Sequence, residues 1–463
     1  MTTQRIRRFR LAAIATGMLA SGLAVAETRI DPALAQRLLG AVPTDQLQVV
    51  ITYGQSGPVT SAQRRVLQGL GITRGITLRE LPIAGALATP SEIRALVSRG
   101  DALSVHLNRN LRYSNADARR MSGVDRVQAN PGDFGLPSGL TGEGVAVMVN
   151  DSGIDATHAD LLFGEHVVEN VQALTNLGSV LGLGQATYLE GQLNTDISSG
   201  HGTHCAGSVG GTGAQSSGGQ RGVAPNASIV GYGSGAVISI LDAVGGIDYA
   251  IANQHAFGDT IKVISNSWGS TGDFDPTDPV NIATYEAAKR GIVSVFAAGN
   301  DGPAADTHNP YAQAPWVVSV GAANKDGTLA DFSSRGQAGE GGTFTMPDGV
   351  QWTWENEPTV VATGVDIVST RALTGLLPLL ATGQDVSLGA LAPYYTHMSG
   401  TSMATPHVAG IIALLFEANP DLTPLEVRAV LHDTADAIGT HAEWEVGGGH
   451  VDAYEAVGVA VGL

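Results

Sequence analysis

Three residues that lie far apart in the sequence carry the side chains that nucleophilic hydrolysis requires: Asp151, His201 and Ser402. A serine hydroxyl becomes a strong nucleophile when a histidine takes its proton and a carboxylate orients that histidine. Asp151 follows the apolar run 145–150, which predicts a buried strand with the carboxylate at its carboxyl end. Taken alone, an aspartate in this position is also typical of a structural turn.

His201 opens a run of small residues, 202–207, which predicts a closely packed helix with the imidazole at its start. Two alternatives stay open for this histidine. His201 and His204 are three residues apart and could bind a metal ion, although no glutamate follows as in His-Glu-x-x-His and no third ligand is evident. Either side chain could also be a buried core histidine.

Ser402 begins a predicted helix over 402–417, so its backbone N–H belongs to the first turn and its hydroxyl faces the positive end of the helix dipole. The alternative is an ordinary N-cap serine. Pro406 within this helix leaves one carbonyl of the preceding turn unpaired and predicts a kink. Asn300 follows the apolar run 292–297, and its amide could donate to an oxyanion or form a plain turn.

The chain order Asp, His, Ser differs from the Ser-Asp-His order of α/β-hydrolases and the His-Asp-Ser order of chymotrypsin-like enzymes. The segments 151–154, 201–207 and 400–407 resemble the three signature blocks of the subtilase family, and the resemblance covers about 139–463. It implies a subtilisin-like α/β fold and serine endopeptidase activity. It also implies a catalytic triad made by Asp151, His201 and Ser402. The oxyanion hole would then consist of Asn300 and the Ser402 backbone N–H.

The same resemblance implies where the substrate binds. Ser267, Trp268 and Gly269 should pair with the substrate backbone as a strand, although a buried core position is the alternative for Trp268. The opposite edge of the cleft is expected at Gly233, Ser234 and Gly235. Ala297 and Gly299 are expected to line the pocket for the residue before the cut.

No cofactor is expected for the chemistry, but the resemblance implies a structural calcium ion near Asp160. The matching loop, 211–221, has no carboxylate, so a loop without calcium is the alternative. The only cysteine, Cys205, excludes an intrachain disulfide. Cys205 lies near His201 in the sequence, and the family resemblance implies sensitivity to thiol reagents; the alternative is a small core residue.

Short apolar strands alternate with helical patterns from residue 139 onward, which predicts a mostly parallel central sheet with helices on both faces. We expect strands at 145–150, 228–232, 262–267, 292–297 and 317–320, and helices at 240–253, 281–290, 402–417 and 424–431. The catalytic domain is therefore assigned to 139–463. Two insertions are expected within it, a hairpin at 343–354 and an excursion at 371–395.

The first 138 residues divide into three expected parts. Residues 1–26 have arginines, a short apolar run and Ala-Val-Ala before the expected cleavage point, which is typical of a signal peptide. Residues 27–115 show a β-α-β-β-α-β order, which predicts a ferredoxin-like unit; strands or helices are expected at 48–53, 61–69, 71–88, 90–99 and 102–113. The resemblance implies that this unit is an inhibitory, chaperone-like propeptide. Residues 116–138 are expected to be a linker and the mature N-terminal segment.

Charge is divided unevenly along the chain. Residues 1–114 have 14 arginines and 6 acidic residues, whereas the remainder has 11 basic and 37 acidic residues. The two parts should attract each other, and the acidic main part argues against nucleic acid as a partner. The expected partners are protein or peptide substrates and the chain's own propeptide.

These observations predict a secreted enzyme, extracellular or periplasmic, which is a monomer without stable membrane insertion. Self-cleavage is expected between Asn110 and Met121, with the last propeptide strand in the active-site cleft. A catalytically silent binding protein on the same fold, an esterase or lipase, and a metal-dependent hydrolase are the competing interpretations.

Overall fold

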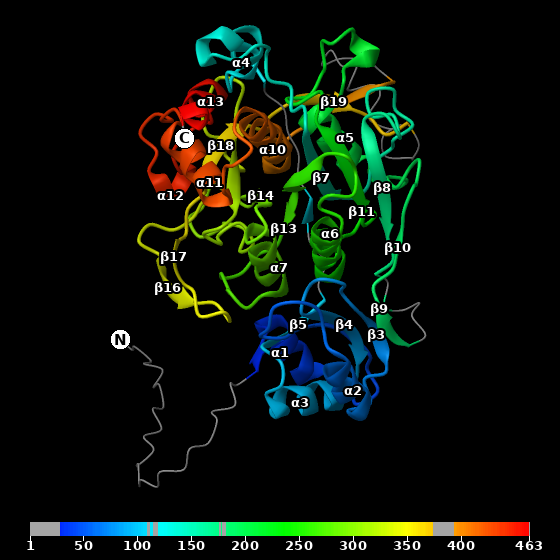
Figure 1. The fold of residues 1–463 in the computed structure, drawn as a ribbon. Coiled ribbons are helices and arrows are strands. Elements are labelled where there is room, and N and C mark those ends of the chain that lie inside the picture. Colours follow the sequence, from blue (N-terminus) through cyan, green and yellow to red (C-terminus); the bar gives the residue numbers. More distant parts are fainter. Residues whose placement is uncertain are drawn as a thin grey trace, which may run out of the picture.

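The computed structural model describes residues 28–108, 112–113, 119–175, 177, 182–373 and 393–462. The expected signal peptide lies outside these residues. Figure 1 shows two parts, a small N-terminal unit (residues 28–108) packed beneath a larger body (residues 119–462). The last strand of the N-terminal region, β6 (Arg112–Tyr113), pairs with a strand of the body.

The body is built on an eight-stranded sheet in the order β10-β8-β11-β7-β12-β14-β15-β18. Every neighbouring pair is parallel except the edge pair β10 and β8. The strands are β7 (Val145–Asp151), β8 (Val167–Ala173), β10 (Tyr188–Leu189), β11 (Ser228–Gly233), β12 (Thr260–Asn266), β14 (Val293–Ala297), β15 (Val318–Ala323) and β18 (Val360–Thr363). The predicted mostly parallel sheet and its five predicted strands are confirmed.

Helices cover both faces of this sheet, as predicted. One face carries α5 (His201–Gly210), α10 (Thr401–Ala418), α11 (Pro424–Asp433) and α13 (Ala453–Gly462), and the other carries α6 (Ile240–Ala252) and α7 (Pro279–Ala288). The short helix α12 (Glu443–Val446) packs through Val446 in a small separate cluster with Val361 of β18. Alternate residues of β7 divide between the faces: Val147 packs on the α10 side and Met148 on the α6 side. Within the described residues, α10 alone is long and apolar enough to cross a membrane, and 89% of it is buried inside the fold.

The segment 116–138, expected to be a linker and the mature N-terminal segment, is partly helical where it is described. It forms α4 (Val124–Ala129) and a short 3-10 helix, η1 (Pro131–Phe134). Val124 and Val127 are fully buried in the core cluster beside α10. Two valines three residues apart among polar residues gave too short an apolar pattern to predict this helix.

The N-terminal unit has the predicted ferredoxin-like order, preceded by β1 (Arg29–Ile30) and α1 (Pro32–Gly40). Its elements are β2 (Leu47–Thr52), α2 (Ser61–Gly69), β3 (Arg74–Thr77), β4 (Ile83–Ala88), α3 (Pro90–Arg99) and β5 (Ser104–Leu107). The sheet order is β1-β5-β2-β4-β3-β9, in which β9 (Leu183–Gln185) comes from the body. Thr60 and Thr89 cap α2 and α3 with capping boxes, which explains why both helices begin where they were predicted.

One predicted strand, 102–113, divides into two that serve different sheets. β5 stays in the N-terminal unit, whereas β6 (Arg112–Tyr113) pairs antiparallel with β13 (Trp268–Gly269) of the body. Residues 109–111, between β5 and β6, lie outside the described residues.

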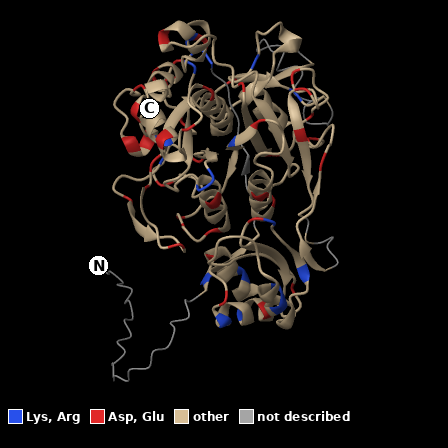
Figure 2. Ribbon diagram, viewed as in Figure 1, with Lys and Arg blue, Asp and Glu red and all other residues tan. Residues whose placement is uncertain are grey.

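The sheet of the N-terminal unit packs on α6 and α7, and Ile76, Leu81 and Ile83 share a core cluster with them. Polar contacts complete this interface. The Asp248 carboxylate in α6 accepts hydrogen bonds from the backbone N–H groups of residues 79, 80 and 81 at 2.9, 2.7 and 3.1 Å. Figure 2 shows basic residues gathered on the N-terminal unit and acidic residues spread over the body.

Both predicted insertions begin and end in paired strands. The hairpin consists of β16 (Gly341–Thr345) and β17 (Gln351–Glu355), paired antiparallel as predicted. The excursion 371–395 lies between β19 (Ile367–Thr370) and β20 (Tyr395–Met398), which also pair antiparallel. Its residues 374–392 lie outside the described part of the chain.

Candidate active site

Asp151 and His201 meet at the carboxyl end of the central strand β7. Asp151 is the last residue of β7 and His201 is the first residue of α5. The Asp151 Oδ1 to His201 Nδ1 distance is 2.6 Å, and both side chains are buried. Burial is the largest single influence and lowers the pKa of His201, but the charge and hydrogen bond of Asp151 together with the contacts of Cys205 raise it, so the pKa lies well above its ordinary value of 6.5. The carboxylate therefore stabilises the imidazolium cation.

A buried network that includes Asp196 fixes the start of α5. The Asp196 carboxylate accepts hydrogen bonds from the Gly200 and Thr203 backbone N–H groups and from the Thr203 and Ser152 hydroxyls, at 2.7–3.0 Å. The Ser152 hydroxyl in turn accepts the Gly202 N–H at 2.8 Å. Asp196 therefore connects Ser152 to Gly200, and Ser152 in turn binds Gly202, so both sequence neighbours of His201 are held.

Gly202 allows this close approach of α5 to β7. A Cβ at position 202 would lie 2.2 Å from the Gly153 carbonyl oxygen, so a side chain there would push the helix away from the strand. Sequence reasoning did not find Asp196. Its signal was a carboxylate five residues before a histidine that starts a helix, a spacing that suits a helix N-terminus.

Ser402 lies in the first turn of α10, directly beside Ser267. The Ser402 hydroxyl donates to the Ser267 carbonyl oxygen at 2.7 Å, and the Ser267 hydroxyl donates to the Ser402 carbonyl oxygen at 2.6 Å. The second bond replaces the helix bond that residue 406 cannot make because it is a proline. The predicted unpaired carbonyl is thus satisfied from outside the helix.

Cys205 lies between the histidine and the serine. Its Sγ is 3.7 Å from His201 Nδ1 and 3.6 Å from the Ser402 carbonyl oxygen. Burial raises the pKa of the Cys205 thiol to about 11, so the thiol is neutral at neutral pH. The environment favours the small core residue over the reactive thiol.

The arrangement does not support a metal site made by His201 and His204. His204 is fully buried, and its Nε2 lies 3.2 Å from the carbonyl oxygens of Ile367 and Thr396. Burial lowers the pKa of His204 to about 3, so the ring is neutral and donates through Nε2. Among the described residues, the one group of three possible metal-binding side chains is Asp151, His201 and Cys205, and the Asp151–His201 hydrogen bond already uses two of its atoms.

Asn300 faces the start of α10 from the loop after β14. Its Oδ1 accepts hydrogen bonds from the Thr401 N–H at 2.9 Å and the Thr401 hydroxyl at 3.0 Å. Because the carbonyl half of the amide is held by Thr401, the amide nitrogen is the end left to donate. This places a donor beside the first turn that carries Ser402.

The expected substrate strand is paired in the structure. The backbone of β13 pairs with β6, with Trp268 opposite Tyr113 and Gly269 opposite Arg112. Trp268 is 1% exposed and its indole N–H donates to the Asn150 carbonyl at 2.7 Å. The side chain is therefore a core residue, and only the backbone of residue 268 faces the paired strand.

Asn309 holds this strand against the end of β14, and sequence reasoning missed it. Its amide nitrogen donates to the carbonyl oxygens of Trp268 and Ala297 at 3.2 and 2.8 Å. Ala297 is buried at the end of β14, and Gly299 has a φ of +111°, which an L side chain rarely adopts. No local pattern distinguishes Asn309 from a turn asparagine.

The segment 233–235 lies beside the end of β7, the strand that carries Asp151. Gly233 is opposite Asp151 in the sheet, and the N–H groups of Ser234 and Gly235 donate to the carbonyls of Asp151 and Ser152 at 2.9 and 3.0 Å. Its role as the second substrate edge stays a prediction.

The contacts of Asp160 do not favour calcium. Its carboxylate accepts hydrogen bonds from the Gly213 and Gln215 N–H groups, both at 3.1 Å, and from the Tyr395 hydroxyl at 2.7 Å. Calcium requires six to eight oxygen ligands, whereas protein donors already satisfy these oxygens. Asp160 thus fastens the loop 211–221 itself, and calcium binding stays a prediction that these residues do not fit.

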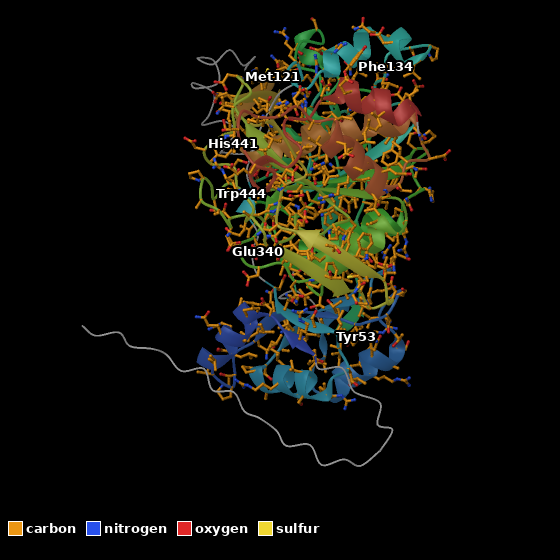
Figure 3. All side chains as sticks on the ribbon, turned by 90° about the vertical axis from the view of Figure 1, so that its left-hand side faces the viewer. Tyr53, Met121, Phe134, Glu340, His441 and Trp444 are labelled. Atoms are coloured by element: carbon orange, nitrogen blue, oxygen red, sulfur yellow. The ribbon has the colours of Figure 1, made fainter. Side chains whose placement is uncertain are left out.

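A separate surface cavity of about 480 Å³ lies between the hairpin and α12. Glu340 and Trp444 line it and are labelled in Figure 3. None of the expected site residues lines this cavity, so it is separate from the candidate site formed by Asp151, His201 and Ser402.

Comparison with known proteins agrees with this geometry. A profile described as the subtilase family (peptidase S8) matches residues 142–452. Serine protease AprX of Bacillus subtilis is 34% identical over 369 residues, which cover 76% of this chain and 73% of that protein. Subtilisin E of the same organism is 33% identical over 315 residues, which cover 65% of this chain and 63% of subtilisin E.

Solved structures show the same architecture. Fervidolysin from Fervidobacterium pennivorans, described as a keratinolytic enzyme related to subtilisin, superposes with a TM-score of 0.63 at 22% identity. The superposition covers 93% of this chain and 63% of fervidolysin, so the likeness in fold extends beyond the region matched by the family profile. Sphericase has a TM-score of 0.51 at 27% identity, covering 71% of this chain and 97% of that one.

Proposed function

The chain belongs to the subtilase family, and on that premise we propose that its serine endopeptidase activity uses Asp151, His201 and Ser402 as the catalytic triad. The observation that carries the proposal is the 2.6 Å contact between Asp151 and His201, with Cys205 in contact with both the His201 ring and the Ser402 backbone. Two residues of the proposed triad are thus in direct contact and the third is one side chain away.

In this mechanism Ser402 attacks the scissile carbonyl carbon while His201 takes its proton through Nε2. Asp151 holds the Nδ1–H and stabilises the cation that forms. The Asn300 amide and the Ser402 N–H hold the negative oxygen of the tetrahedral intermediate. His201 then gives its proton to the leaving amine, and water releases the acyl group by the same steps. No metal ion or cofactor takes part.

We further propose that the chain is made as a precursor whose N-terminal unit inhibits the enzyme. The β6–β13 pairing supports this, because a chain paired with β13 uses the backbone that a substrate strand would use. The interface with α6 and α7, and the opposite charges of the two parts, support stable association. Self-cleavage between Asn110 and Met121 would separate the two parts covalently.

Export as a secreted enzyme is proposed from the N-terminal arginines and short apolar run. We also propose that the enzyme acts as a monomer on protein or peptide substrates.

Expression of the wild-type chain and of Ser402→Ala tests both proposals. Wild type should lose its N-terminal region and hydrolyse casein, whereas pure Ser402→Ala should stay full length and inactive. Processing of pure Ser402→Ala would contradict self-cleavage. Hydrolysis of short esters without hydrolysis of casein would instead indicate an esterase, and loss of activity to chelators but not to serine reagents would indicate a metal-dependent hydrolase.

A further inference from the structure

A short strand of the body completes the sheet of the N-terminal unit. β9 adds to the outer edge of β3 in parallel, with Gly75, Ile76 and Thr77 opposite Leu183, Gly184 and Gln185. In Figure 1, β9 lies next to β3 at the lower end of the arm that descends from β10. This contact is separate from the β6–β13 pairing at the active site.

Hydrogen bonds at both ends of this pair fix its register. The Gly75 N–H donates to the Gly182 carbonyl at 3.3 Å, and the Ala186 N–H donates to the Thr77 carbonyl at 2.7 Å. The Thr77 hydroxyl donates to the Gly184 carbonyl at 3.2 Å, and the Arg79 side chain donates to the Ala186 carbonyl at 3.3 Å. Main-chain bonds supply the pairing, as in β-strand addition to an exposed sheet edge.

Leu183 adds an apolar contact to these bonds. It packs against the hydrophobic core of the N-terminal unit, a cluster that otherwise consists of residues between 34 and 107. Leu183 comes from the body, so the core of one part of the molecule is completed by a side chain of the other. By contrast, Leu193, a few residues further along the chain, is 60% exposed.

β9 and the active-site strand hold different ends of the N-terminal region. β3 lies at the far side of the sheet from β5, the strand that leads to β6. A cut in the chain after β6 would remove a covalent link near the active site but would leave every β3–β9 contact in place. Without β9, the β3 edge would present unpaired backbone groups.

We propose that Leu183–Gln185 is a second docking strand for the N-terminal unit, which holds this unit on the body after the chain between them is cut. The proposal rests on the proposed precursor function and deepens it. Loss of the cleaved unit, and hence release of activity, requires β9 to separate from β3 as well as β6 from β13.

The pairing itself is tested in the full-length Ser402→Ala chain by hydrogen–deuterium exchange. Leu183→Ala and Ala186→Pro should increase exchange of the amides of residues 74–77 by about two- to tenfold, the range expected for loss of one net hydrogen bond or a comparable contact. Leu193→Ala, at an exposed leucine ten residues further along the chain, is the matched control and should leave exchange unchanged. Unchanged exchange in both test variants would overturn the proposal.

Retention is tested in the active chain by the delay between self-cleavage and the appearance of peptidase activity. Leu183→Ala should shorten this delay several-fold at the same cleavage rate, and Leu193→Ala should not. Thr77→Val, which removes only the hydroxyl bond to Gly184, is the milder variant if the others fold poorly. A delay that none of these changes alters would overturn the proposal.

The exchange experiment and the activity experiment together distinguish failure of this proposal from failure of the proposed function. If the wild-type chain never gains activity while exchange at residues 74–77 responds as expected, the precursor function fails and the docking strand stands. If activity appears normally and exchange does not respond, only the docking strand fails.

Discussion

The Ser267 hydroxyl donates to the Ser402 carbonyl oxygen at 2.6 Å, at the one position in the first turn of α10 where proline at residue 406 withholds the helix donor. The Ser402 hydroxyl returns a bond of 2.7 Å to the Ser267 carbonyl. The two serines thus hold the turn of the proposed nucleophile against the segment that leads into β13. The carbonyl that Pro406 leaves unpaired within α10 therefore accepts a bond from Ser267 and so joins two parts of the site.

Ser267→Ala should lower kcat more than it changes KM, because it loosens the turn that carries Ser402. The substitution leaves the buried Ser402 carbonyl oxygen without the hydroxyl that donates to it, which should lower the free energy of unfolding by about 1–3 kcal/mol. Ser265→Ala is the matched control, since the Ser265 hydroxyl, in β12 two residues before Ser267, is buried without a hydrogen-bond partner in the described structure. Equal effects of the two changes, measured by steady-state kinetics and urea unfolding, would show that the Ser267 bond has no special role.

The pH dependence of kcat/KM should show an acid limb set by His201. The imidazole must be neutral to take the proton of Ser402, and Asp151 holds the pKa of His201 well above 6.5. Activity should therefore rise with pH through an inflection above 6.5. Asp151→Asn should reduce kcat by about 10⁴ and move this inflection to lower pH, because the charge that raises the pKa is gone. An inflection that stays in place in Asp151→Asn would assign the limb to another group.

Asn300→Ala should reduce kcat with little change in KM. Its amide nitrogen is the donor left beside Ser402 after Thr401 binds the amide oxygen, and loss of the oxyanion-hole asparagine in a subtilisin costs about 10²–10³ in kcat. Thr401→Val serves as a comparison, because it leaves the amide present but removes one of the groups that orient it. A large rise in KM with unchanged kcat would place Asn300 in ground-state binding instead.

Asp248→Asn should weaken the contact between the N-terminal unit and the body. The carboxylate accepts three backbone N–H groups, from Arg79, Glu80 and Leu81, and an amide cannot accept all three without turning its own donor toward them. In the Ser402→Ala chain, trypsin should cut the arginine-rich N-terminal unit faster. Asp259→Asn, which removes only an acceptor of the Ser228 hydroxyl, should not change the rate.

Cys205 should resist alkylation in the folded protein. Its side chain is fully buried, and burial raises its pKa to about 11. Iodoacetamide at pH 8 should label it only after urea unfolding, as read by intact mass. Rapid labelling of the folded enzyme would show that the site opens far more than the structure indicates.

The sequence was sufficient to predict the elements whose residues are apolar throughout. Strands β7, β11 and β14 match their predicted ranges within one or two residues, because a fully buried strand reads as a continuous apolar run. Strand β8, which lies second from one edge of the sheet, was missed, since its partly exposed positions include Glu169 and Gln172. The docking strand β9 was missed because it pairs through its backbone and has one partly buried leucine.

The candidate site divides in the same way. Asp151, His201 and Ser402 could be found because each ends a strand or starts a helix, where parallel sheets bring side chains together. Asp196, Asn309 and the Ser267 hydroxyl each make at least one hydrogen bond to a segment 40 or more residues away, such as the bond from the Ser152 hydroxyl to Asp196, which are 44 residues apart. Nothing in the local sequence encodes such partners.

Covalent labelling of the active enzyme with a fluorophosphonate, followed by peptide mass spectrometry, tests the triad most directly. The account predicts one adduct per molecule, on Ser402, with loss of peptidase activity in proportion to labelling and no adduct in His201→Ala. Full loss of activity with Ser402 unmodified, or an adduct on another serine that accounts for the loss, would contradict it.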